Sequence, residues 1–235
     1  MIVAAALCAS PPLLHPALTG RAVVLPELRA ACAEAVARLL RFGPELVVVV
    51  GPAPATGELD PHGQFDPAAF APGSAASPGA GGLSLGTGLG AMLLDEAGYR
   101  GPRRLLGVSS DEPTGACAAL GAELAAGTAR TAMLVMGDGS ARRSLKAPGH
   151  LDPRAEPFDA QVERAVRAGR LGELLKLDEA LARDLMVTGR PAWQVLAGAM
   201  PDGAGATGAL ATEMLYRDDP FGVAYLVACL YPRSR

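Results

Sequence analysis

The chain has 235 residues, half of them hydrophobic, and a formal net charge of −3 at neutral pH. A chain of this length buries a sizeable core without disulfides or metal, so one large α/β domain or two small ones are expected. The acidic balance provides no basic surface for nucleic acid, and no apolar run reaches the roughly 20 residues of a membrane helix. We therefore expect neither a nucleic-acid partner nor a membrane partner.

The cysteines and the apolar N-terminal run bear on the cellular compartment. The cysteines are Cys8, Cys32, Cys117 and Cys229. They lie far apart, form no CxxC pair and have apolar neighbours, which predicts buried free thiols, with metal or disulfide pairing as the lesser alternative. The run at 1–8 lacks a basic start and is cut short by Pro11 and Pro12, so a first strand explains it better than a signal peptide. We expect a soluble, cytoplasmic protein.

The first 50 residues alternate between strand and helix patterns. Residues 2–8 and 46–50 are apolar runs of strand length, typical of strands covered on both faces. Between them, apolar residues at helical spacing predict a helix over 26–42, which Pro26 begins and Gly43-Pro44 ends. This β-α-β order predicts a parallel strand pair.

Two further stretches of the first half are predicted to be irregular. Residues 13–20 read as a loop that contains His15. Residues 51–82 are rich in Pro, Gly, Ala and Ser, contain His62, and read as a long excursion within one domain. A loop of this length in a compact domain is usually either a binding loop or partly disordered.

The remaining chain continues the alternation. Helices are expected at 83–99, at 112–126 with Ser110 or Asp111 as cap, at 155–168, at 171–187, at 191–200 and, after a Gly-rich turn at 202–208, through Leu210, Met214 and Leu215. Strands are expected at 104–109, 131–136 and 222–230. The pattern predicts a single α/β domain over 1–235, with a central, mostly parallel or mixed sheet covered by helices on both faces.

The strand at 131–136 organises the candidate site, because ligands of α/β proteins usually bind just past the carboxyl ends of strands. Asp138 follows this strand between two glycines, and we weigh backbone capping and ligand binding equally for it. Ser140 comes next, but the G-x-S-x-G pattern of a nucleophile elbow fails at Arg142, which disfavours a serine hydrolase. Arg142 and Arg143 then suit a carboxylate- or phosphate-bearing ligand.

Two other motifs are ambiguous. Gly86-Thr87-Gly88-Leu89-Gly90 has G-x-G-x-G spacing and no clear preceding strand, so glycines that ease a helix start are favoured over a nucleotide site. His15, His62 and His150 lie in predicted loops and show no ligand spacing. An iron site with two histidines and one carboxylate would require two of them to converge with an acid.

Three segments together resemble the class III extradiol ring-cleavage dioxygenase subunit-B-like proteins, including the Memo-like branch. Ser10-Pro11-Pro12 stands where that family has a His-Pro-Pro-like turn, and Gly137-Asp138-Gly139-Ser140-Ala141 where it has an Asp-x-Ser-His-like motif. The downstream helix around Trp193 and the closing strand also match. The resemblance covers nearly the whole chain and implies the family's α/β fold, with Fe(II) held by two histidines and a glutamate.

The departures from that family change the expected chemistry. Ser10 occupies the first ligand position, Gly51-Pro52-Ala53-Pro54 the second, and Ala141 the acid/base position. Glu213, Asp218 and Asp219 are merely near the place of the terminal carboxylate. Serine and alanine do not replace imidazole as ligands of a divalent metal, so no cofactor is expected.

The sequence therefore predicts a dioxygenase-like protein that has lost its iron ligands and acts in small-molecule binding or assembly. The expected pocket residues are Ser10, Gly51, Asp138, Ser140, Arg142 and Arg143. The alternative is an active Fe(II)-dependent ring-opening dioxygenase or hydrolase that uses non-standard histidines, with His15 and His62 as candidate metal ligands. A structural partner subunit is a third option, and homo-oligomerisation stays open.

Overall fold

The strands form one mixed sheet in the computed structural model, which describes residues 1–20, 22–67, 82–202 and 210–232. They are β1 (Ile2–Cys8), β2 (Leu46–Pro52), β3 (Gly57–Leu59), β4 (Arg103–Val108), β5 (Thr131–Met136), β6 (Leu210–Asp218) and β7 (Tyr225–Pro232). Their order in the sheet is β3-β4-β2-β5-β1-β7-β6. The four neighbours β4, β2, β5 and β1 are parallel, whereas β3, β7 and β6 pair antiparallel. The predicted α/β class is confirmed.

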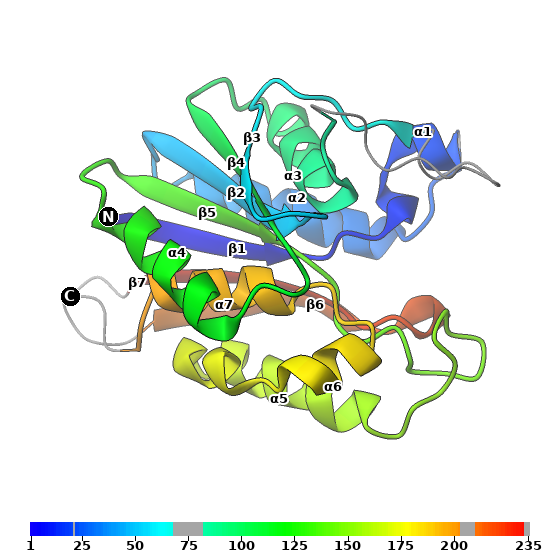
Figure 1. Ribbon diagram of the computed structural model, residues 1–235. Coiled ribbons are helices and arrows are strands. Elements are labelled where there is room, and N and C mark those ends of the chain that lie inside the picture. Colours follow the sequence, from blue (N-terminus) through cyan, green and yellow to red (C-terminus); the bar gives the residue numbers. More distant parts are fainter. Residues whose placement is uncertain (21, 68–81, 203–209, 233–235) are drawn as a thin grey trace.

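Helices cover both faces of this sheet (Figure 1). They are α1 (Pro16–Thr19), α2 (Pro26–Leu40), α3 (Leu85–Glu96), α4 (Thr114–Ala126), α5 (Ala155–Arg167), α6 (Glu179–Asp184) and α7 (Arg190–Ala199), with 3₁₀ turns η1 (Pro12–Leu14), η3 (Leu171–Lys176) and η4 (Pro220–Gly222). Side chains of α2 and α3 pack on one face, and side chains of α4, α5, α7 and η3 pack on the other. Among the helices described, none is long and apolar enough to cross a membrane.

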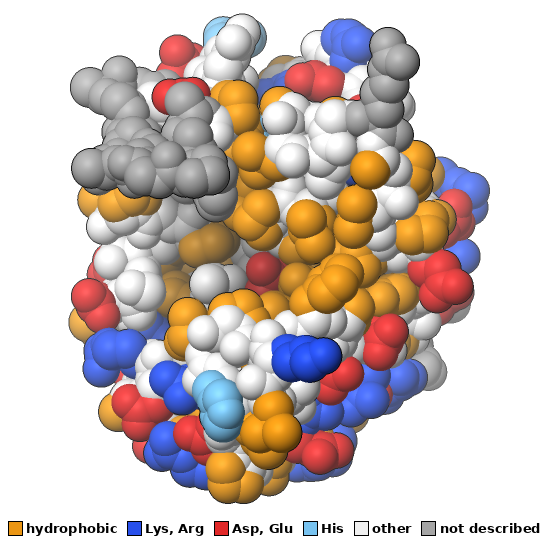
Figure 2. Space-filling model, turned by 90° about the vertical axis from the view of Figure 1, so that its right-hand side faces the viewer, with side chains coloured by type: hydrophobic (Ala, Val, Ile, Leu, Met, Phe, Trp, Pro, Cys, Tyr) orange, Lys and Arg blue, Asp and Glu red, His pale blue; other side chains and the backbone are white. Residues whose placement is uncertain are grey.

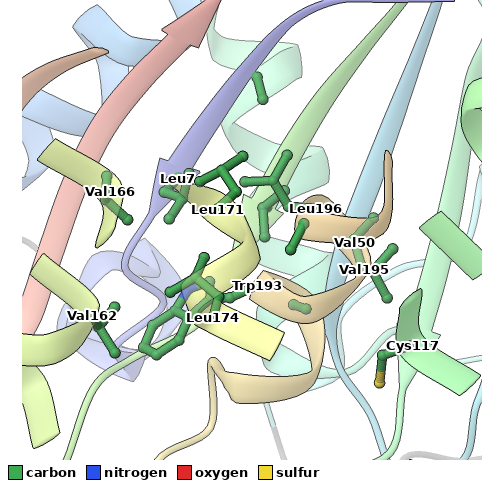
Figure 3. Close-up of a cluster of buried hydrophobic side chains, with 14 of the residues drawn as sticks. Leu7, Val50, Cys117, Val162, Val166, Leu171, Leu174, Trp193, Val195 and Leu196 are labelled. Carbon is green, nitrogen blue, oxygen red and sulfur yellow. The ribbon is translucent and has the colours of Figure 1, made fainter. Parts of the chain in front are cut away.

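Alternating residues of the strands bury their side chains in two separate hydrophobic cores. Leu7 and Val50 lie in one cluster with Trp193 and Leu196 of α7 and Leu171 of η3, and Leu7 lies near Leu171 (Figure 3). All five side chains are 2% exposed or less, and complete burial of such a side chain stabilises the fold by about 1.5–3 kcal/mol. The predicted buried thiols are confirmed as well, since all four cysteines are buried and free.

Two glycines set the close approach of α4 to α7. A Cβ at Gly121 would lie 2.0 Å from the carbonyl oxygen of Val195, and one at Gly198 would lie 2.1 Å from that of Ala118. Both distances are far below any real contact. The small side chains of this alanine-rich sequence are therefore a packing requirement at this crossing.

Several predicted elements are corrected by the structure. The helix expected from Leu210 is the edge strand β6, which pairs along its whole length with β7; pairing with a neighbouring strand overrides a weak local pattern. Of the turn expected at 202–208, residues 203–208 lie outside the described residues. The strands β1 and β2 point the same way, but β5 lies between them, so the expected parallel pair is wrong as a pair of neighbours.

The ends of several other elements also differ. Helix α4 begins at Thr114, and neither Ser110 nor Asp111 caps it. Instead, Glu179 accepts hydrogen bonds from the backbone N–H and the hydroxyl of Thr114 at 2.8 and 2.6 Å. The helix expected over 171–187 divides into η3 and α6, the loop at 13–20 contains η1 and α1, and the excursion at 51–82 contains β3. Residues 68–81 of that excursion lie outside the described residues.

Candidate functional site

The carboxyl ends of β1, β2 and β5 meet at one edge of the sheet. Cys8 pairs with Met136, and Val50 with Val135, so the residues that follow these strands come together. A cavity of about 520 Å³ opens there, and Figure 2 shows a hollow bordered by hydrophobic side chains on this side of the molecule. The cavity is lined by Ser10, Pro52, Ala53, Pro54, Leu85, Gly86, Ser110, Asp138, Arg183, Met186, Val187 and Thr188.

Asp138 is the only carboxylate among these lining residues. The backbone N–H of Ser10 donates to its Oδ1 at 2.6 Å, and its own N–H donates to Oγ1 of Thr188 at 3.0 Å. Asp138 is half-buried by surface area, yet protein surrounds its carboxyl group closely enough that burial raises the pKa to about 7, against the opposing effect of the Ser10 N–H. Near neutral pH this carboxyl group therefore exists in both protonation states.

Glycines bring helix α3 against the wall of this cavity. A Cβ at Gly51 would lie 3.0 Å from the backbone nitrogen of Thr87, and a Cβ at Gly86 would lie 2.6 Å from Cδ of Pro52. Gly51 thus supports the wall from behind and does not line the cavity. Gly86 serves this contact, whereas a Cβ at Gly88 would lie 2.7 Å from Cβ of Phe65 and one at Gly90 would lie 2.4 Å from Cγ1 of Val49. The glycines of α3 are therefore required for close packing on three sides of the helix start.

Ser140 and Arg143 lie in a second place, where the turn after β5 contacts α5. The N–H and hydroxyl of Ser140 donate to the Asp159 carboxylate at 2.9 and 2.5 Å. Burial raises the pKa of Asp159, and these two hydrogen bonds oppose that effect. Arg143 lies 2.8 Å from Asp219 and 3.9 Å from Asp159, so carboxylates of the protein already pair with its guanidinium group.

The predicted pocket residues are thus divided. Ser10 and Asp138 line the large cavity, whereas Ser140 is fully buried and Arg143 borders a separate cavity of about 30 Å³. Arg142 lies beside Met186, since a Cβ at Gly149 would touch both side chains. Its Nε is buried without a hydrogen-bond partner among the described residues, but the Arg142 side chain does not line the large cavity.

The three histidines lie apart from the Asp138 cavity. Nδ1 of His15 accepts the N–H of Ala17, and its ring packs on Phe65 with centroids 4.6 Å apart; burial lowers its pKa. His62 is exposed and borders a different surface cavity, beside Asp95 and Arg103. His150 is exposed as well.

The donor set around the large cavity does not fit Fe(II). A site with two histidines and one carboxylate needs two imidazoles, whereas the described residues that line the cavity include one carboxylate and no imidazole. Throughout the ranges that the structure describes, no group of three or more His, Cys, Asp or Glu side chains is arranged to hold a metal ion.

The wall formed by residues 183–188 was not predicted from the sequence. This segment begins in the last turn of α6 and brings Arg183, Met186, Val187 and Thr188 to the cavity, with Met186 in a left-handed conformation at φ 58°. Its only local sign is the Gly189-Arg190-Pro191 break that follows. Arg190, buried at 1% exposure, holds the facing loop by donating to the carbonyls of Ser110 and Glu112 at 2.6 and 2.9 Å.

Comparison with known proteins supports the fold and does not identify the function. The chain matches no protein-family model and no curated protein. It is similar to a solved structure, the crystal structure of uncharacterized protein JW3007 from Escherichia coli K12, with a TM-score of 0.60 and 17% sequence identity over 97% of this chain and 99% of that chain. At this identity the likeness shows a shared α/β fold alone.

Proposed function

We propose that this protein binds a compact, largely apolar small molecule in the cavity at the ends of β1, β2 and β5. The observation that carries the proposal is this cavity, with its single carboxylate, Asp138. Its volume of about 520 Å³ falls within the range of roughly 300–1,000 Å³ that is usual for small-molecule sites. Pro52, Leu85, Met186 and Val187 supply the apolar wall, which is also usual for such sites.

The resemblance to extradiol dioxygenases supports a binding role without iron chemistry. Ser10 stands at the first ligand position and lines the cavity, where it offers a hydroxyl in place of an imidazole. Ala141 stands at the acid/base position and is buried, with its N–H donating to the carbonyl of Leu185. Among the described residues that line the cavity there is a hydroxyl and an apolar wall but no imidazole, which fits binding better than dioxygen activation.

A fragment screen by NMR, with a variant that fills the cavity, tests the proposal. Leu85→Trp puts a larger side chain into the lining, and we expect it to abolish fragment binding while the unfolding midpoint stays close to that of the wild type. Val23→Trp is the matched control, because Val23 is 72% exposed and does not line the cavity. Fragment binding that survives Leu85→Trp, or no binding to the wild type at all, contradicts the proposal.

Elemental analysis of protein purified without chelator, followed by iron re-addition, tests the dioxygenase alternative separately. Near-stoichiometric iron that is lost on replacing His15 or His62 would favour the metal-dependent enzyme over a binding protein. An absence of bound iron after reconstitution would leave the binding proposal as the working one.

A further inference from the structure

We infer that the ligand of the large cavity carries a protonated amine, which pairs with the Asp138 carboxylate while an apolar body fills the rest of the space. This inference rests on the proposed function, because it assigns a ligand class to the same cavity. It depends on three properties of the described residues: an unpaired carboxylate, a cation that is already engaged, and an apolar wall.

Among the residues that the structure describes, no cationic side chain pairs with the carboxylate of Asp138. In the described part of the chain it forms no salt bridge, and one backbone N–H, that of Ser10 at 2.6 Å, is its hydrogen-bond donor. An ionised carboxylate accepts about four hydrogen bonds, so most of its capacity is unused. The start of α3 also borders the cavity, through Leu85 and Gly86, but a helix N-terminus contributes only about half a positive charge.

The one cationic side chain of the lining is paired elsewhere. Nε of Arg183 lies 3.2 Å from Oδ1 of Asp111, and these side chains are 58% and 74% exposed, which places the pair at the rim. Arg183 and Asp111 therefore neutralise each other in solvent. The negative charge of Asp138 is left for a ligand to balance.

Anionic, neutral and cationic ligands would interact differently with the Asp138 carboxylate. An anion would be repelled, and a neutral hydroxyl would gain one hydrogen bond. An ammonium group offers three donors and forms charge-assisted hydrogen bonds, which are about twice as strong as neutral ones. Burial, which raises the pKa of Asp138 to about 7, penalises the unpaired anion, and an ammonium partner removes that penalty and brings the pKa down.

Three probes with one ring separate these cases: benzylamine, benzyl alcohol and benzoate, titrated at pH 7.5 by calorimetry or NMR. We expect benzylamine to bind the wild type at least tenfold more tightly than benzyl alcohol, and benzoate to bind least. In Asp138→Asn the preference for benzylamine over benzyl alcohol should disappear, because benzylamine loses much more affinity than benzyl alcohol does. Asp95→Asn is the control for net charge, because Asp95 is a surface residue paired with Arg103.

The outcomes distinguish the inference from the proposed function. Equal or tighter binding of benzyl alcohol or benzoate, or an amine preference that persists in Asp138→Asn, overturns the amine inference; the binding proposal then stands if Leu85→Trp still abolishes binding. If none of the three probes binds the wild type at millimolar concentration, the amine inference fails, and the fragment screen with Leu85→Trp decides the binding proposal. A lower Asp138 pKa in the benzylamine complex, and not with benzyl alcohol, is a second supporting readout.

Discussion

Replacing Asp138 by Asn should stabilise the protein at alkaline pH. The pKa of this carboxyl group is raised from 3.8 to about 7 in the folded chain, with burial as the main cause. The folded state then holds a proton that the unfolded state has released, so between about pH 4 and pH 7 stability falls as pH rises. Asparagine carries no charge and keeps an oxygen that can accept the Ser10 N–H, so the variant avoids this loss.

The magnitude follows from the size of the pKa difference. One pKa unit corresponds to about 1.4 kcal/mol, so a difference of roughly three units destabilises the wild type by up to about 4 kcal/mol above pH 7. We expect Asp138→Asn to be more stable than the wild type by up to that amount at pH 8. The difference should shrink to below about 1 kcal/mol near pH 4, where the folded wild type is protonated and the unfolded carboxyl group is close to its own pKa of 3.8.

Urea unfolding between pH 4 and pH 8, followed through Trp193 fluorescence, measures this difference; Trp193 is the single tryptophan and is 2% exposed. Asp152→Asn is the control, because the Arg154 side chain lowers the pKa of Asp152 to about 2 and the residue stays ionised throughout this range. Its difference from the wild type should hardly vary with pH. A difference for Asp138→Asn that is independent of pH, or a loss of stability at pH 8, would refute the reasoning.

Three further predictions concern contacts that stabilise the fold, each measured by chemical denaturation. Arg190→Met leaves the carbonyls of Ser110 and Glu112 without their buried donor and should destabilise the fold by about 3 kcal/mol; a loss under 1 kcal/mol would contradict this. Gly121→Ala should cost about 2 kcal/mol or more, since its Cβ would overlap the Val195 carbonyl, whereas Gly115→Ala in the same helix meets nothing within 4 Å and should be neutral or stabilising. Ser140→Ala removes a donor to the partly buried Asp159 and should cost about 1–3 kcal/mol, most at alkaline pH where Asp159 is ionised; equal costs at pH 4 and pH 8 would argue against it.

The sequence predicted the central strands and Asp138 because local patterns specify them. The runs at 2–8, 46–50 and 131–136 are apolar on both faces, which only a covered central strand explains. Asp138 follows such a strand between glycines, and strand ends in α/β sheets are where ligands bind. These inferences need no knowledge of distant segments.

The remaining features depend on contacts that no local pattern encodes. Thr188 lies 50 residues from Asp138, and nothing in its neighbours indicates that its hydroxyl accepts the Asp138 N–H. The orientation of the Ser140 side chain is not encoded locally either. The turn after β5 has no strand periodicity, and the Ser140 hydroxyl points toward Asp159. The local sequence of β6 predicts a helix, because its strand character comes only from pairing with β7.

The contrast between Asp138 and Asp159 indicates which carboxylate serves a ligand. Burial raises both pKa values, but Asp159 receives two hydrogen bonds from Ser140, has Arg143 nearby, and borders a cavity of only about 30 Å³. Asp138 has one backbone donor and opens on about 520 Å³. An acid whose ionisation destabilises the fold without an internal partner is expected where a ligand supplies that partner. Asp138→Asn should therefore both gain stability and lose the preference for an amine. If this variant gained stability but kept the amine preference, the charge of Asp138 would not be the feature that the ligand recognises.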